Sequence, residues 1–119
     1  MNTRLLGAWG EEIALKHYKK MKYKPVALGF QTRFGEIDII VENKQYIVFA
    51  EVKLRKNAAF AQAREFVDTR KCQRIRTTAE IWLAANDTDK QPRFDVVEIY
   101  APDGLETKKP EVTIIENAF

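Results

Sequence analysis

Three charged residues interrupt the most apolar part of the sequence, the segment "GEIDIIVENKQYIVFAEVKLR" at residues 35–55. Asp38, Glu51 and Lys53 stand where an apolar strand would carry valine. Two carboxylates held close together repel each other, and a hard divalent cation between them relieves that repulsion. Mg²⁺ prefers oxygen ligands and is commonly held by one or two carboxylates together with the phosphate oxygens of a substrate. These residue types therefore predict metal-assisted phosphodiester hydrolysis, with Lys53 orienting or deprotonating the attacking water.

The spacing of the three residues puts them on one face of a predicted β-hairpin. The runs "EIDIIV" and "YIVFAEV" are rich in β-branched and aromatic residues and are separated by "ENKQ", which is typical of an antiparallel hairpin. With residues 43–44 at the tip, Asp38 pairs with Phe49. Residues two apart share a face, so Glu51 is a diagonal neighbour of Asp38, within about 7 Å, and Lys53 follows on that face. This convergence predicts a site rather than scattered charges.

The elements around this hairpin are predicted from the periodicity of the apolar residues. A helix is expected from about residue 4 to 21, with Thr3 as its cap, and a short edge strand at 24–32. Asp68 can cap a second helix that ends near "AANDTD"; "RFDVVEIY" then forms a strand and "EVTIIENAF" a last strand or an ordered tail. The predicted order is αβββα with one or two further strands, an α/β fold with a mixed sheet flanked by helices. The apolar stripes of the two helices are Leu6, Trp9, Ile13, His17 and Met21 in the first, and Cys72, Ile75, Ala79, Trp82 and Leu83 in the second.

Length and composition indicate one globular domain over residues 1–119. Apolar residues make up 45% of the chain and charged residues 31%, which is the composition of a folded protein rather than a disordered one. The single Cys72 excludes an intrachain disulfide and suits a reducing compartment. No apolar stretch is long enough for a signal-peptide core or a membrane span. A cytoplasmic protein without a membrane partner is expected.

Basic residues gather in two blocks, although the net charge is only +3. "KHYKKMKYK" carries five lysines between Lys16 and Lys24, and "TRKCQRIR" carries Arg70, Lys71, Arg74 and Arg76. Both blocks could hold the phosphate backbone of a nucleic acid. The alternative for the lysine block is a solvated helix end, where positive charge suits the helix dipole. The alternative for the second block is a solvated helix face.

Several blocks of the sequence resemble known families. Asp38, followed thirteen residues later by Glu51-Val52-Lys53, resembles the D…E-x-K signature of the PD-(D/E)XK nuclease superfamily, whose core is αβββαβ and restriction-endonuclease-like. "GAWGEEIALKHY", "GEIDII", "FAEVKLR" and "RFDVVEIY" resemble the YraN-like family, uncharacterised proteins related to archaeal Holliday junction resolvases. The match runs over nearly the whole chain.

This resemblance implies a set of site residues. Asp38, Glu51 and the backbone carbonyl of Val52 would hold Mg²⁺, for which Mn²⁺ can substitute, and Lys53 would be catalytic. Glu11 matches a glutamate of the first helix that in resolvases contributes to the metal site or its water shell. On a helical wheel Glu11 also lies at the border of the apolar stripe, beside the small residues Gly7 and Ala14 and beside Tyr18. Contacts to nucleic acid are expected from Arg55, Arg70, Lys71, Arg74 and Arg76.

Structural alternatives remain open for these residues. Asp38, Glu51 and Lys53 could form a structural ion pair, although burying such a pair is seldom a net gain in stability. Glu11 also suits the helix dipole. Asp95 either pairs structurally with a basic group or braces Lys53. The remaining candidates are expected to be core or supporting residues: His17, Trp9, Trp82 and Phe94 in the core, and Glu36 behind the metal ligands.

The expected function is a Mg²⁺-dependent endonuclease for structured or branched DNA. The alternative is a nucleic-acid-binding module that keeps the fold but cleaves little or not at all. Resolvases work as dimers, so the resemblance also predicts a homodimer, with the segment "VTIIENAF" supplying the contact through Ile114 and Phe119 or through strand pairing. The same segment could instead close its own sheet.

Overall fold

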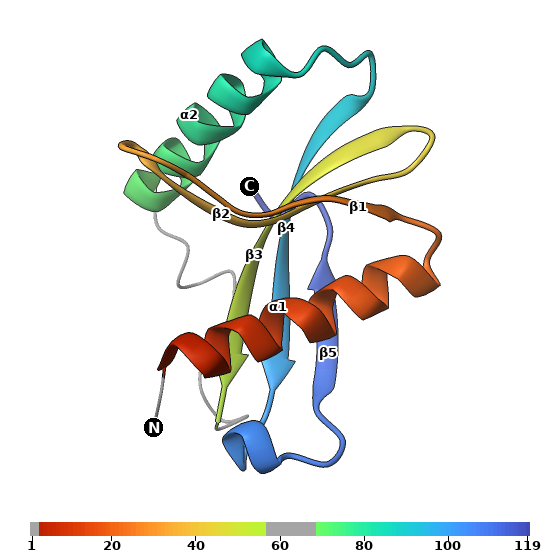
Figure 1. Cartoon of the computed structure of the whole chain (residues 1–119), viewed down its shortest axis with the longest axis vertical. Helices are drawn as coiled ribbons and strands as arrows, with labels where there is room; N and C mark the ends of the chain where they lie inside the picture. The colour runs from red at the N-terminus through yellow and green to blue at the C-terminus, as the bar shows by residue number, and fades with distance from the viewer. Residues whose placement is uncertain (1–2, 57–68) are drawn as a thin grey trace.

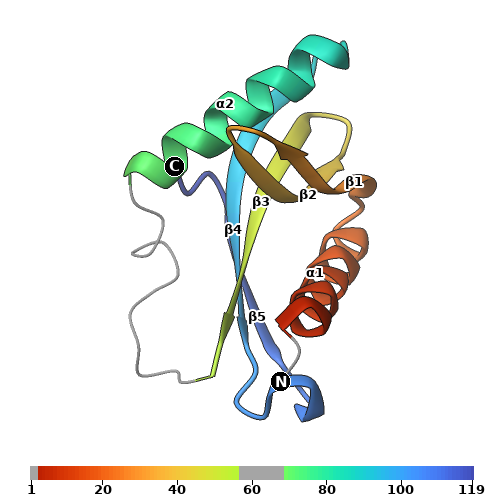
Figure 2. The ribbon, with the colours of Figure 1, turned by 60° about the vertical axis from the view of Figure 1, so that its left-hand side comes forward.

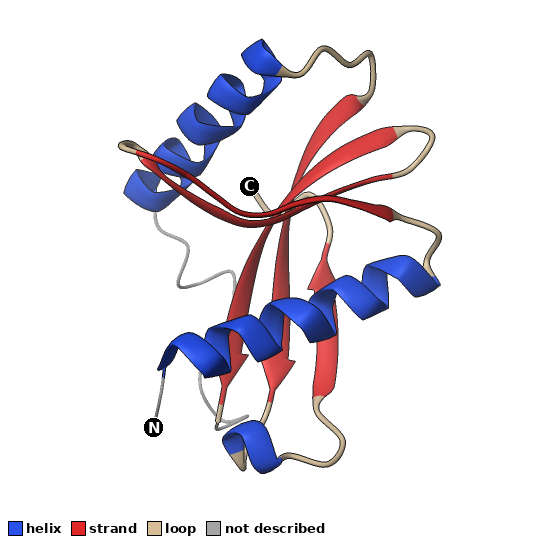
Figure 3. Ribbon diagram, in the orientation of Figure 1, coloured by secondary structure: helices blue, strands red, loops and turns tan. Residues whose placement is uncertain are grey.

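The protein folds as a five-stranded mixed sheet with a helix on each face, as the sequence predicts (Figures 1 and 3). The computed structural model describes residues 3–56 and 69–119. The elements in chain order are α1 (Thr3–Lys20), β1 (Lys24–Thr32), β2 (Gly35–Glu42), β3 (Tyr46–Arg55), α2 (Thr69–Ala85), β4 (Gln91–Tyr100), the 3₁₀ helix η2 (Gly104–Glu106) and β5 (Glu111–Ile115). Asp68 and the side chain of Thr3, the expected caps, lie outside the described residues.

The strands are arranged in the order β1-β2-β3-β4-β5, with β3 at the centre. All neighbouring pairs are antiparallel except β3 and β4, which are parallel. A parallel pair needs a crossover connection, and α2 lies within the one that joins β3 to β4. Side chains alternate along β3, so Val48 and Ala50 pack under α1 while Ile47 and Phe49 pack under α2. The charged residues Glu51 and Lys53, which follow at odd positions on β3, therefore face α2 like Ile47 and Phe49.

Helix α1 packs on the sheet through a face whose centre lies about one residue from the predicted stripe. Its most buried residues are Gly10, Ala14 and Tyr18, while Met21 of the predicted stripe is 42% exposed. A Cβ added at Gly10 would lie 3.2 Å from Leu54 Cδ1, so glycine sets how closely the helix approaches the sheet. The centre of the contact thus lies one residue beyond the predicted stripe, although Trp9 and Ile13 of that stripe do pack against this core, because the prediction followed the bulk of the apolar side chains rather than the closest approach of the backbone.

Helix α2 covers the other face with the residues predicted for it. Ile75, Ala79 and Trp82 are buried, and Trp82 meets Phe49 edge to face with ring centroids 5.8 Å apart. Thr78 is fully buried as well, which apolar periodicity does not anticipate. Neither α-helix in the described ranges has a run long and apolar enough to cross a membrane.

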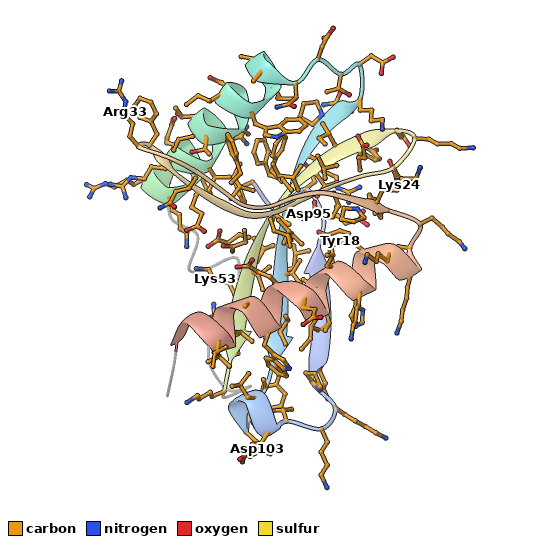
Figure 4. The ribbon with its side chains drawn as sticks, viewed as in Figure 1. Tyr18, Lys24, Arg33, Lys53, Asp95 and Asp103 are labelled. Atoms are coloured by element: carbon orange, nitrogen blue, oxygen red, sulfur yellow. The ribbon has the colours of Figure 1, made fainter. Side chains whose placement is uncertain are left out.

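A buried carboxylate, Asp95, fastens three parts of the chain together. Its oxygens accept hydrogen bonds from the Tyr18 hydroxyl at 2.8 Å and from Arg93 Nε at 2.9 Å and Nη2 at 2.8 Å. The backbone N–H of Asn117 donates a fourth at 3.0 Å. Figure 4 shows Tyr18 reaching from α1 towards Asp95. Of the two roles predicted for Asp95, these contacts support the structural one.

The C-terminal segment closes its own sheet. Strand β5 pairs antiparallel with β4 from Val96↔Ile115 to Tyr100↔Glu111. Ile114 packs against the core under α1, and Phe119 packs on Phe94 with ring centroids 5.4 Å apart. Of the two roles predicted for this segment, the structure shows that it closes its own sheet. The homodimer stays a prediction, and the contact expected from this segment no longer supports it.

Candidate functional site

The site lies where β2 separates from β3. The ladder between the two strands runs from Glu42↔Ile47 to Ile39↔Ala50, and beyond it β2 continues from Ile37 back to Gly35 paired with β1. In Figure 2 the β1–β2 hairpin bends away from β3 and its closed end approaches α2. Asp38 is the first residue past the last β2–β3 pair. The sheet therefore opens next to a carboxylate.

The hairpin register differs from the predicted one by two residues. Phe49 lies opposite Ile40 and not opposite Asp38, because the two-residue tip lies at residues 44–45, one position later than predicted, and the Asn43 N–H donates to the Tyr46 carbonyl at 3.0 Å. Asn43 closes this turn, since its Oδ1 accepts the N–H groups of the residues two and three positions later at 2.9 and 2.7 Å. A slip of two residues leaves every side chain on its predicted face. Continuing the observed register places Asp38 directly opposite Glu51, closer than the predicted diagonal.

The Asp38 side chain accepts a backbone hydrogen bond from β3 at the point where the β2–β3 ladder ends. Its Oδ2 accepts the N–H of Val52 at 2.8 Å. In an extended strand the N–H and C=O of one residue point to the same edge, so the Val52 carbonyl also points towards the Asp38 side. Burial and the charge of Glu51 raise the pKa of Asp38 to about 7, and the bond from Val52 opposes this only in part.

Glu51 is the buried partner in the cluster, with only 8% of its surface exposed. Its Oε1 lies 3.3 Å from Lys53 Nζ on the same strand and 2.6 Å from Lys71 Nζ on α2. The contact with Lys71 was not anticipated, because the sequence groups Lys71 with its arginine neighbours as a contact to nucleic acid. No pattern in the sequence separates Lys71 from its arginine neighbours, because its pairing depends on how α2 packs on the sheet.

The two lysines titrate in opposite directions. Burial lowers the pKa of Lys53, the close approach of Lys71 lowers it further, and the charge of Glu51 offsets only part of this. Burial also acts to lower the pKa of Lys71, but its bond to Glu51 and the surrounding carboxylate charge outweigh burial and leave that pKa raised. Lys53 is therefore the lysine that releases its proton more readily.

Glu11 lies at the border of this cluster. It is half-buried on α1, and its pKa is raised by burial and then by the charges of Glu36 and Glu51. Within residues 3–56 and 69–119, no three acidic, histidine or cysteine side chains come together as a ready-made metal site. The oxygen donors of the site are thus Asp38, Glu51 and the Val52 carbonyl, and the charge of Glu51 acts on Glu11.

A cleft of about 390 Å³ opens onto the two carboxylates. Arg70, Lys71 and Arg74 line it from α2, so three of the predicted contacts to nucleic acid surround the site. Arg76 lies elsewhere, with its guanidinium 4.9 Å above the ring of Phe94. The remaining predicted residues are placed as follows: Arg55 at the end of β3, two residues beyond Lys53, and Glu36 in the lining of the cleft.

The lysine block of the first helix does not join the cleft. Its five lysines are exposed, and Figure 4 shows Lys24 on the opposite side of the molecule from Lys53 and Arg33. His17 in the same block is only half-buried rather than a core residue. The contacts thus distinguish the two basic blocks, and only the block on α2 borders the carboxylates.

The titration of Asp38 predicts how stability depends on pH. Its pKa of about 7 in the folded protein lies above the ordinary 3.8, so the folded state binds a proton more tightly between these values and loses stability as the pH rises through them. Asp38→Asn keeps an oxygen acceptor for Val52 and does not titrate. The melting temperature of the variant minus that of the parent, measured in EDTA, should grow from pH 4 to 7 and then level off. A constant difference would contradict the raised pKa.

Comparison with known proteins gives the chain a family. Residues 10–99 match the model of "Uncharacterised protein family UPF0102". A UPF0102 protein of Acetivibrio thermocellus is 42% identical over 99% of this chain and 93% of its own length. Similar relatives occur in Caldanaerobacter subterraneus subsp. tengcongensis, at 39% identity over 100% of this chain and 98% of the relative, and in Photobacterium profundum, at 40% identity over 87% and 85%.

Proposed function

The chain belongs to the uncharacterised protein family UPF0102, and from its site we propose that it is a metal-dependent endonuclease of the PD-(D/E)XK type. Its substrate would be structured or branched DNA. The observation that supports this most is the position of Asp38 and Glu51, opposite each other where β2 leaves β3, with Lys53 next along the strand. Side chains in a cleft whose pKa values are shifted by burial and by one another, as those of Asp38 and Lys53 are, mark a candidate functional site.

The donor set fits a hard divalent cation. Asp38, Glu51 and the Val52 carbonyl offer oxygen atoms only, which Mg²⁺ and Mn²⁺ prefer. Burial and the neighbouring charge of Glu51 disfavour the ionised form of Asp38, so a cation there would relieve a repulsion that the protein otherwise carries. Bound at these oxygens, such a cation supplies charge stabilisation for the phosphate and a lowered pKa for a water molecule.

The residues of the chain would supply the rest of the reaction. Lys53, with its lowered pKa, is suited to hold the attacking water and accept its proton as the new phosphorus–oxygen bond forms. The bond to the leaving oxygen breaks, and that oxygen takes up a proton from solvent. Arg70 and Arg74 line the cleft and would hold the flanking backbone phosphates.

A second candidate function is supported by one contact. Lys71 Nζ lies 2.6 Å from Glu51, so a lysine already neutralises one of the two carboxylates. A nucleic-acid-binding module that does not cleave would keep this ion pair and the arginines of α2 without needing a metal. The 2.6 Å ion pair is thus the observation that favours the binding module. The two functions are distinguished by whether the protein cleaves the DNA that it binds.

Cleavage assays on a panel of DNA test the proposal. The protein should cut forked or four-way DNA in Mg²⁺ or Mn²⁺, show no cutting in EDTA, and lose at least about 100-fold in rate as Lys53→Met, the scale of one general acid–base group. Gel analysis of linear, forked and four-way substrates would measure this. Metal-independent binding without any cutting would support the binding module instead.

A further inference from the structure

The closed end of the β1–β2 hairpin is anchored on α2. A Cβ added to Gly35 would lie 3.2 Å from Thr78 Oγ1 and 3.3 Å from Arg74 Cβ, so this glycine lets the turn pack tightly on the helix. Thr32 Oγ1 accepts the N–H of Phe34 at 3.1 Å and lies 3.4 Å from Thr78 Oγ1. The Thr78 hydroxyl donates to the carbonyl of Arg74 at 2.8 Å. Phe34 therefore lies in a turn whose position is fixed by its contacts with α2.

Phe34 presents its ring to the outside of the molecule. Phe30 of the same hairpin packs on the core under α2, whereas Phe34 is 43% exposed. The guanidinium of Arg33 lies 4.8 Å from the centroid of the Phe34 ring, and Figure 4 shows Arg33 at the outer end of the hairpin. The tip thus carries a flat, cationic and aromatic surface.

This surface borders a hollow that leads to the carboxylates. The hollow, about 540 Å³ in volume, lies between the hairpin tip and α2, with Arg33 and Phe34 on one wall and Arg74 on the other. It shares three lining residues with the smaller cleft that contains Asp38 and Glu51: Gly35, Glu36 and Arg74. A polyanion whose backbone follows the arginines into the cleft would pass the ring of Phe34.

Aromatic rings and guanidinium planes bind nucleobases by stacking. Inside a duplex both faces of each base are already covered by its neighbours, so the interior of a duplex offers Phe34 no free face to stack on. A base that is unpaired and unstacked has a free face. We propose that Phe34, together with Arg33, receives an unpaired base of the strand held in the cleft, so that nucleotides beside a branch point or in a single strand are preferred.

This inference rests on the proposed function and adds to it a substrate feature and the residues that select it. Binding can be measured by fluorescence anisotropy in EDTA, with a forked DNA that has single-stranded arms and with a linear duplex matching its paired part. Phe34→Ala should weaken binding to the fork about 5- to 150-fold, the range for the loss of one stacked base. Affinity for the linear duplex should stay the same.

Two further measurements separate stacking from charge. The slope of fork affinity against salt concentration should be the same in Phe34→Ala as in the parent, because stacking releases no counterions. The variant Phe34→Trp, which keeps an aromatic ring, should bind the fork as tightly as the parent. The matched control is Leu105→Ala, which removes another exposed apolar side chain, 39% exposed, from η2. Asp103, its neighbour, marks that end of the molecule, far from Arg33 (Figure 4). This control should bind both DNAs like the parent.

The outcomes distinguish this inference from the proposed function. If Phe34→Ala weakens fork and duplex binding equally, or weakens neither, the ring does not receive a base and the inference is overturned, while cleavage by the parent would leave the proposed function standing. If the parent neither binds nor cuts any DNA of the panel, the proposed function fails and this inference fails with it.

Discussion

Asp38→Asn should remove metal binding while leaving the fold intact. Calorimetry with Mn²⁺ should show binding in the parent and an affinity at least about 100-fold weaker in the variant, because even indirect partners of metal ligands change affinity 10- to 100-fold. Cleavage in Mg²⁺ should fall with it. The metal-free variant should fold at least as well as the parent, since the substitution removes a charge that burial and Glu51 disfavour.

The best control for this variant is the same substitution far from the site. Asp103→Asn changes an acid beside η2, where the side chain makes no cap hydrogen bond, at the far end of the molecule from the hairpin tip (Figure 4). It should bind Mn²⁺ like the parent. Lys53→Met should also keep metal binding, because a lysine is not a ligand, and lose only cleavage. An unchanged affinity in Asp38→Asn would rule out the metal site at these oxygens.

The convergence of Asp38 and Glu51 could be predicted from the sequence because it depends only on which face of a strand each residue occupies. Strand side chains alternate with a period of two, so a register wrong by two residues still places them together. The actual position of the turn depends on the side chain of Asn43, whose Oδ1 accepts two N–H groups, and a sequence pattern does not show at which residues the turn will form.

The contacts between elements were harder to predict. The face of α1 depends on how closely its backbone approaches Leu54 at Gly10, and glycine contributes nothing to an apolar stripe. The ion pair of Lys71 with Glu51 joins a helix to a strand twenty residues away, and only the packing of α2 on the sheet brings them together. Local periodicity carries no information about such distances.

The exposed ring of Phe34 illustrates the same limit. In the sequence Phe30 lies within the predicted strand at 24–32 and Phe34 lies just beyond it, but no pattern shows that the ring of Phe34 is exposed while Phe30 packs against the core. The difference arises because the hairpin bends towards α2 and ends in a turn there (Figure 2). Sequence patterns thus locate the carboxylates, while the surface that would choose a substrate follows from the tertiary arrangement.

The largest effect on stability is expected from Asp95→Ala. This carboxylate is fully buried and receives four hydrogen bonds, two of them from Arg93, which is itself only 6% exposed. Removing one partner of a buried pair leaves the other charge uncompensated and costs about 3–5 kcal/mol. The typical free energy of unfolding of a domain is about 5–15 kcal/mol, so this loss is a large fraction of it. The melting temperature should fall by roughly 10 to 20 °C. Tyr18→Phe, which deletes a single hydrogen bond to Asp95, should cost only about 1 kcal/mol.

The same variant separates the two roles considered for Asp95. Asp95 pairs with Ala50 in the β3–β4 ladder and contacts Tyr18 of α1, so by strand alternation it faces α1, whereas Glu51 and Lys53 face α2. Cleavage by Asp95→Ala, assayed well below its melting temperature, should therefore stay close to that of the parent. Hydrogen exchange should speed up chiefly around Asn117 and β5, which lose their tie to the core. A large loss of cleavage in a folded Asp95→Ala would instead mean that Asp95 acts through Lys53.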